Sequence, residues 1–114
     1  MRNFVQSGNY LDLTAPRDLA SGEGFIIGSI FAIASHAVAS GAEVPGCTEG
    51  VFDLPKKPAA IFAVGDKVSW DDATHQCDAP GTGLYPVGVA LAAAGTGEGI
   101  VRVKLSEVPT SAAP

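Results

Sequence analysis

The sequence predicts an all-β protein: a small single-domain β-barrel or β-sandwich of short antiparallel strands with flexible termini. Short apolar segments recur along the chain and are separated by turn residues. Several of these segments alternate apolar and polar side chains with a period of two, which is typical of strands. Glycine (14) and proline (8) are frequent for 114 residues, which disfavours long helices. This length corresponds to one domain.

The first strands are expected before residue 34. Residues 9–14 alternate between apolar and polar side chains, and Pro16 ends that strand because proline cannot donate to a ladder. Residues 25–27 and 30–33 are aromatic and β-branched, so they predict two consecutive strands with a bend at Gly28.

A helix over residues 29–40 is the alternative for this part of the chain, because the stretch contains no glycine or proline. Its Ile30, Ile33 and Val38 are weak helix formers, which favours strands. Further strands are expected from residue 42 through Thr48, with a kink at Pro45, and then over residues 48–54.

The sequence of the second half of the chain predicts a rigid, charged loop and four more strands. The loop is formed by residues 55–58. Residues 67–70 and 75–77 form a hairpin, and residues 100–105 form an amphipathic strand with Arg102 and Lys104 on its outer face. Along residues 84–94, one face carries Val87, Val89 and Leu91, and the other carries the small residues Gly88, Ala90 and Ala92.

The small-residue face of this strand is nearly flat, so another backbone can approach it closely. A domain of this size is marginally stable alone, and association would bury such a face. We therefore predict a subunit of an assembly, with an oligomer interface at Val87, Gly88, Ala90 and Ala92.

The composition argues against several classes of partner. Lys and Arg number 7 against 12 Asp and Glu, a net charge of -5. This charge disfavours direct binding of nucleic acid and of an anionic membrane surface. The longest apolar run, residues 25–39, is too short and too interrupted to span a bilayer, and the N-terminus has no secretory signal pattern.

No catalytic or metal-binding motif is found in the sequence. The candidate ligands lack the paired spacing of zinc sites; they are His36, Cys47, His75 and Cys77. The nucleophile pattern Gly-x-Ser-x-Gly does not occur. We expect no enzyme activity, no metal and no cofactor, with Trp70 in the core. Two buried free thiols are favoured, although spacing alone leaves open whether the cysteines pair.

Ordered motifs along nearly the whole chain resemble one family. They are residues 3–6, 11–16, 21–24, 49–55, 65–71, 86–90 and 101–105, for example the sequence Gly-Asp-Lys-Val-Ser-Trp-Asp at 65–71. Each motif is weak by itself, and the ordered set is similar to the capsid cement (head decoration) proteins of bacteriophages and prophages. Cys47, Cys77 and the longer tail depart from that pattern.

The resemblance implies a β-rich structural virion protein on the outer surface of a tailed-phage head. Such a protein binds as a homo-oligomer, a trimer rather than a dimer, and reinforces contacts between major capsid proteins. It would be made and assembled in the bacterial host cytoplasm. We expect residues 1–8 to form an N-terminal arm or first strand on the capsid, residues 9–108 the cement domain and residues 109–114 a flexible tail. The expected capsid contacts are Arg2, Asn3, Phe4, Val5 and Gln6.

Two other functions are compatible with the residues. A small ligand- or carbohydrate-binding β-barrel would have an aromatic-lined pocket around Tyr10, Trp70 or Tyr85. A small metal-dependent hydrolase would depend on His75 and Cys77 alone.

Overall fold

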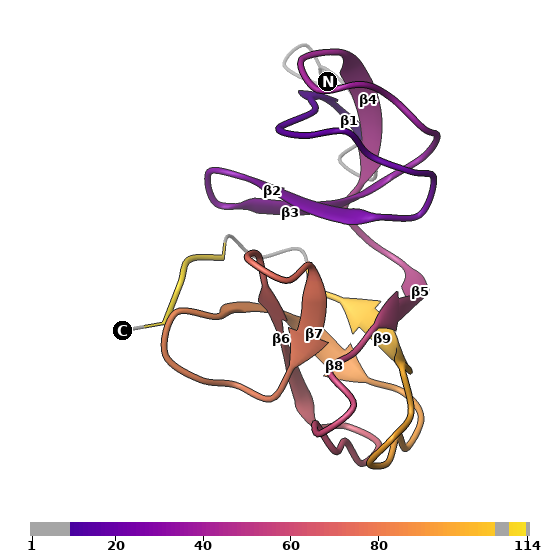
Figure 1. Ribbon diagram of the computed structural model, residues 1–114, viewed down its shortest axis with the longest axis vertical. Helices are drawn as coiled ribbons and strands as arrows, with labels where there is room; N and C mark the ends of the chain where they lie inside the picture. Colours follow the sequence, from indigo (N-terminus) through magenta and orange to yellow (C-terminus); the bar gives the residue numbers. More distant parts are fainter. Residues whose placement is uncertain (1–9, 107–109, 114) are drawn as a thin grey trace, which may run out of the picture.

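The computed structural model describes residues 10–106 and 110–113, and these residues form strands and loops without a helix (Figure 1). The strands make two antiparallel sheets, in the orders β1-β4-β3-β2 and β5-β9-β8-β6-β7. Their bounds are β1 (Tyr10–Thr14), β2 (Gly24–Ile27), β3 (Ile30–Ala34), β4 (Glu43–Cys47), β5 (Val51–Pro55), β6 (Lys67–Asp71), β7 (Gln76–Asp78), β8 (Tyr85–Ala90) and β9 (Ile100–Leu105).

The four-stranded sheet is one long hairpin folded back on itself. In the pairs between the two arms of this hairpin the residue numbers add up to 57: Tyr10 with Cys47, Thr14 with Glu43, Leu19 with Val38, Gly24 with Ile33, and Ile27 with Ile30. The tip is at Gly28, whose positive φ of 58° suits a tight two-residue turn. The hairpin bends in the middle, so that β3 pairs with β4 through Ile33 with Cys47 and Ala34 with Gly46.

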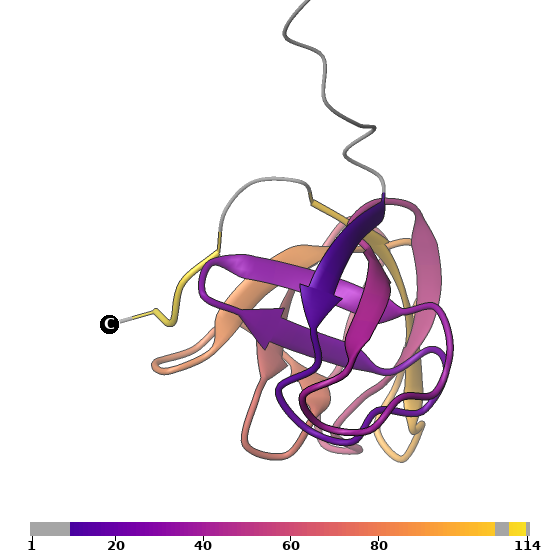
Figure 2. The ribbon, with the colours of Figure 1, turned by 90° about the horizontal axis from the view of Figure 1, so that it is seen from above.

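The folded hairpin has a small core between its two layers. Phe25 lies at its centre and is fully buried. The remaining members are mostly small or aliphatic, so the two layers can lie close together: Ala15, Leu19, Ala32, Ala34 and Val44. The hairpin above and the five-stranded sheet below are separate layers in Figure 1, and Figure 2 shows the hairpin lying over the other sheet.

The five-stranded sheet curls until its two edges meet. Lys56 follows β5 and forms a parallel bridge with Cys77 on β7, and the Lys57 amide donates to the Cys77 carbonyl over 3.0 Å. The sheet therefore has a half-barrel curl, with its two edges linked by this single bridge, and we call it the barrel. Its core packs against the hairpin, because the rings of Phe31 on β3 and Trp70 on β6 lie 5.2 Å apart.

The predicted strand positions agree with the structure in most of the described residues. The bend at Gly28 separates β2 from β3, and the amphipathic strand at residues 100–105 is β9. The alternative helix over residues 29–40 is wrong, because these residues continue the hairpin ladder. The strand expected over residues 84–94 ends at Ala90, and the one expected at 48–54 begins at Val51.

The residues of the predicted flexible tail are partly described. Thr110 is buried, and its amide donates to the Ser29 carbonyl at the hairpin tip over 2.9 Å. The Ala113 amide donates to the Leu84 carbonyl over 2.9 Å. Residues 110–113 therefore lie between the hairpin tip and the chain that enters β8.

An ion-pair group holds the loop after β5 to the β6–β7 hairpin. Lys57 Nζ lies 2.6 Å from a carboxylate oxygen of Asp71 and 3.3 Å from one of Asp78. The hydrogen bond from Lys57 lowers the pKa of Asp71, and the Ala73 amide, which donates to the same carboxylate over 2.9 Å, adds to this effect. The folded state therefore favours the ionised form of Asp71.

We expect the stability of the protein to fall in acid, partly through Asp71. A carboxyl group whose pKa is lowered by folding stabilises the folded state above its unfolded pKa of about 4, and this contribution is lost as the pH falls through the folded pKa. The variant Asp71→Asn should therefore lose less thermal stability than the wild type between about pH 6 and pH 3. Melting curves at each pH measure this difference, and parallel curves for the two proteins would contradict it.

Candidate functional site

The residues predicted as sites fall in different places. Arg2, Asn3, Phe4, Val5 and Gln6, the expected capsid contacts, lie outside the described residues. Of the expected oligomer interface, Val87 is 2% exposed and Ala90 is 0% exposed, because both side chains belong to the barrel core. Gly88 and Ala92 are half-buried and reach the surface in part.

A bulge explains why the alternation expected along residues 84–94 is wrong. On β6, Ser69 pairs with Pro86 and the preceding residue, Val68, pairs with Gly88. Val87 has no partner on β6 and is therefore the extra residue of a bulge on β8. After the bulge the inward and outward positions exchange, and Ala90 points into the barrel together with Val87. Val87 and Ala90 therefore offer no surface to a partner in this structure.

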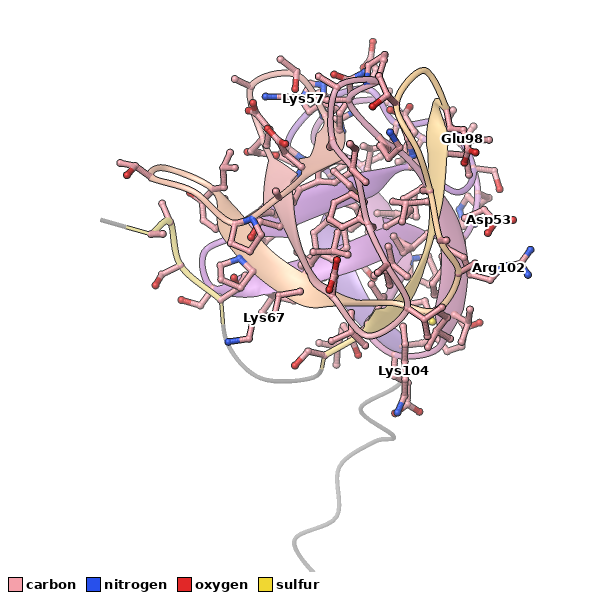
Figure 3. The ribbon with its side chains drawn as sticks, turned by 90° about the horizontal axis from the view of Figure 1, so that it is seen from below. Asp53, Lys57, Lys67, Glu98, Arg102 and Lys104 are labelled. Atoms are coloured by element: carbon pink, nitrogen blue, oxygen red, sulfur yellow. The ribbon has the colours of Figure 1, made fainter. Side chains whose placement is uncertain are left out.

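The outer surface of the barrel carries a row of four residues that the sequence did not reveal. We call it the lysine row: Val51 on β5, Lys104 on β9, Val89 on β8 and Lys67 on β6, each paired with the next across the sheet. Neighbours in such a row point to the same side of a sheet. Lys67 and Lys104 extend from the same side of the barrel in Figure 3, away from Lys57.

The two lysines of the row differ from the other cations among the described residues. Arg17 pairs with Glu23, Lys57 with Asp71 and Asp78, and Arg102 with Asp53, whereas Lys56 is buried. Within residues 10–106 and 110–113, neither Lys67 nor Lys104 has a carboxylate partner. The row is therefore a locally positive surface on an acidic chain.

A groove of about 430 Å³ adjoins the lysine row. Its floor includes Gly88 and Val89, and Ser106 and Ser111 supply hydroxyl groups at its wall. Thr110 fixes this wall because its hydroxyl donates to the Pro86 carbonyl over 2.6 Å. The lining of the groove thus combines the ammonium group of Lys67 with hydroxyl groups and apolar side chains.

The hairpin carries the opposite charge. Asp12 on β1 pairs with Pro45 on β4, and Thr14 pairs with Glu43, so Asp12 and Glu43 are diagonal neighbours on one face of the ladder. Both side chains are exposed, and neither forms an ion pair in the part of the chain that the structure describes. Tyr10, which is 57% exposed, belongs to the same face. We call Tyr10, Asp12 and Glu43 the acidic face.

A comparison with protein-family models assigns the chain. The model described as phage cement protein matches residues 5–105, which include all nine described strands. The chain belongs to the phage cement protein family. Cement proteins are structural proteins of the virion, so this member is associated with the phage capsid. No curated protein and no solved structure matches the chain.

The three aromatic residues predicted to line a ligand pocket lie apart in the described chain. Trp70 is 1% exposed, packs on Phe31, and donates from its indole nitrogen to Asp72 over 3.2 Å. Tyr10 lies on the hairpin and Tyr85 at the start of β8, and neither lines the groove beside the lysine row. Trp70 thus occupies the core as expected.

The cysteines of this family member are buried free thiols. Burial raises the pKa of the Cys77 thiol to about 12, so the reactive thiolate is disfavoured. Among the described residues, no group of three or more His, Cys, Asp or Glu side chains is placed to hold a metal ion. These residues also contain no helix that is long and apolar enough to cross a membrane.

Proposed function

We propose that this chain binds the outer surface of a tailed-phage head as a homo-oligomer, a trimer rather than a dimer, and stabilises the head by bridging adjacent major capsid proteins. The family match over residues 5–105 carries this proposal. The protein would be made and assembled in the cytoplasm of the bacterial host.

The physical chemistry of the chain supports such a role. An outer position requires no basic charge, since the genome lies inside the shell, and the net charge is -5. A small domain makes only modest contacts with each capsid subunit. An oligomer that engages several subunits at once converts these weak contacts into avidity, which strengthens the shell without any turnover.

The N-terminal segment is the proposed contact with the major capsid protein. The proposed contact residues end three residues before β1 in the sequence; they are Arg2, Asn3, Phe4, Val5 and Gln6. A terminal segment of this kind can add as a strand to an exposed sheet edge, where backbone hydrogen bonds supply affinity. Apolar residues such as Phe4 and Val5 would then fill pockets of the partner.

Deletion of residues 1–7 should abolish binding to the head and leave the described β-structure folded, because β1 begins at Tyr10. Co-sedimentation with undecorated capsids measures the occupancy, and circular dichroism with a melting curve checks the fold. A second variant with residues 2–7 in scrambled order keeps length and charge, and it should also fail to bind. Unchanged occupancy of the deletion variant would exclude the proposed contact.

A further inference from the structure

We propose that the lysine row of one copy binds the acidic face of a second copy, so that the oligomer is held by a head-to-tail contact between barrel and hairpin. This inference rests on the proposed oligomer and names the surfaces that form it. The barrel side consists of Val51, Lys67, Val89 and Lys104, and the hairpin side of Tyr10, Asp12 and Glu43.

Charge complementarity selects a second copy as the partner. Among the described residues, the lysine row holds the two exposed lysines that lack a carboxylate partner, and no acidic residue interrupts the row. The acidic face holds two exposed carboxylates on neighbouring strands, and no cation within the described chain neutralises them. Each surface thus lacks what the other provides, and contact between copies satisfies both.

The spacing of the charges is compatible with simultaneous pairing. Lys67 and Lys104 lie two strand positions apart with Val89 between them, about 10 Å between their Cα atoms. Asp12 and Glu43 are diagonal neighbours, with about 7–8 Å between their Cα atoms. The long, flexible lysine side chains can converge over this difference, so each carboxylate can receive one ammonium group.

Apolar side chains accompany the charges on both surfaces. Val51 is 51% exposed at one end of the lysine row, and Tyr10 is 57% exposed beside the carboxylates. Tyrosine is enriched in protein interfaces because it combines a large apolar ring with a polar tip. Burial of these groups would add to the attraction between the ion pairs, which contribute little when they remain exposed.

The lysine row and the acidic face are different surfaces, so a contact between them can be heterologous, with each copy presenting one surface to each of its two neighbours. A two-fold contact that places one lysine row on another would oppose like charges. A head-to-tail contact instead repeats from copy to copy and closes into a ring when its rotation allows. A ring of three copies is the arrangement that fits the proposed trimer.

A charge-swap experiment tests this contact on the full-length chain. The double variant Lys67→Glu/Lys104→Glu and the double variant Asp12→Lys/Glu43→Lys should each weaken self-association by about tenfold or more. The variant that combines all four substitutions keeps the wild-type net charge and should regain self-association. Sedimentation equilibrium over a range of concentrations measures the association constants, and circular dichroism checks that each variant is folded.

A control variant and a replacement variant accompany the charge-swap experiment. Glu98→Lys changes an exposed charge outside both surfaces and should leave the association unchanged. If a reversal variant misfolds, Lys67→Gln/Lys104→Gln replaces it and should weaken association while making it less sensitive to salt. A wild-type chain that stays monomeric, reversals without effect, or a combined variant that remains dissociated would each overturn the contact.

Binding to undecorated capsids separates this inference from the proposed function. If the wild-type chain co-sediments with capsids and the reversal variants still self-associate, the contact between copies is wrong and the capsid role stands. If the wild-type chain self-associates through the predicted surfaces but does not bind capsids, the capsid role is wrong and the contact between copies stands.

Discussion

The variant Gly88→Ala should unfold far more readily than the wild type, with a loss of about 3 kcal/mol in the free energy of unfolding. A Cβ atom at position 88 would collide with the backbone carbonyl oxygen of Lys104 on the neighbouring strand. That carbonyl belongs to the β8–β9 ladder and cannot rotate away as a side chain can. The two strands would have to separate locally, at the centre of the barrel sheet.

Gly99→Ala provides the matched control for this substitution. No atom lies within 4 Å of a Cβ built at Gly99, and its φ is not in the left-handed region. Its stability should therefore change by about 0.5 kcal/mol or less. Urea unfolding followed by tryptophan fluorescence measures both variants, since Trp70 is buried in the barrel. Equal stabilities for the two variants would contradict the predicted collision.

The second large effect is expected for Lys56→Met, which should destabilise the protein by about 2 kcal/mol. Lys56 is 1% exposed, and its ammonium group donates to the carbonyls of Ala60 over 2.6 Å and of Lys57 over 3.0 Å. Methionine has a similar length but no donor, so these carbonyls would lose their partner in a region with little access to water.

The neighbouring lysine is the control for Lys56. Lys57→Met removes a partly exposed ion pair with Asp71 and should cost about 1 kcal/mol or less. Urea unfolding of both variants gives the comparison, and a larger effect at position 57 than at 56 would refute the assigned role of the buried ammonium group.

The fold class could be predicted because strand periodicity and turn residues are local signals. Gly28 and the aromatic and β-branched residues around it correctly indicated two strands, β2 and β3, with a break between them. The bulge at Val87 could not be read from the sequence, because it depends on how β6 and β8 pair. The interior location of Lys56 was also missed, since a Pro-Lys-Lys-Pro sequence is typical of an exposed loop.

The candidate surfaces required knowledge of which strands are neighbours. The alternating pattern of β9 placed Lys104 on an outer face, but it gave no indication that Lys67 lies two strands away in the same row. Asp12 and Glu43 are likewise distant in the sequence and meet only because the hairpin returns along itself. Long-range pairing brings these charges together, and local patterns carry no information about it.

The fixed register of the β1–β4 and β2–β3 pairs constrains how the length of this hairpin can change. One residue inserted into β2 before Phe25 would move the later side chains of that strand to the opposite face of the sheet. Phe25 would then leave its buried position. An insertion or deletion in one arm therefore has to be matched in the other arm or absorbed by a bulge. Folded variants of this hairpin with a different length should therefore gain or lose residues in pairs, one in each arm.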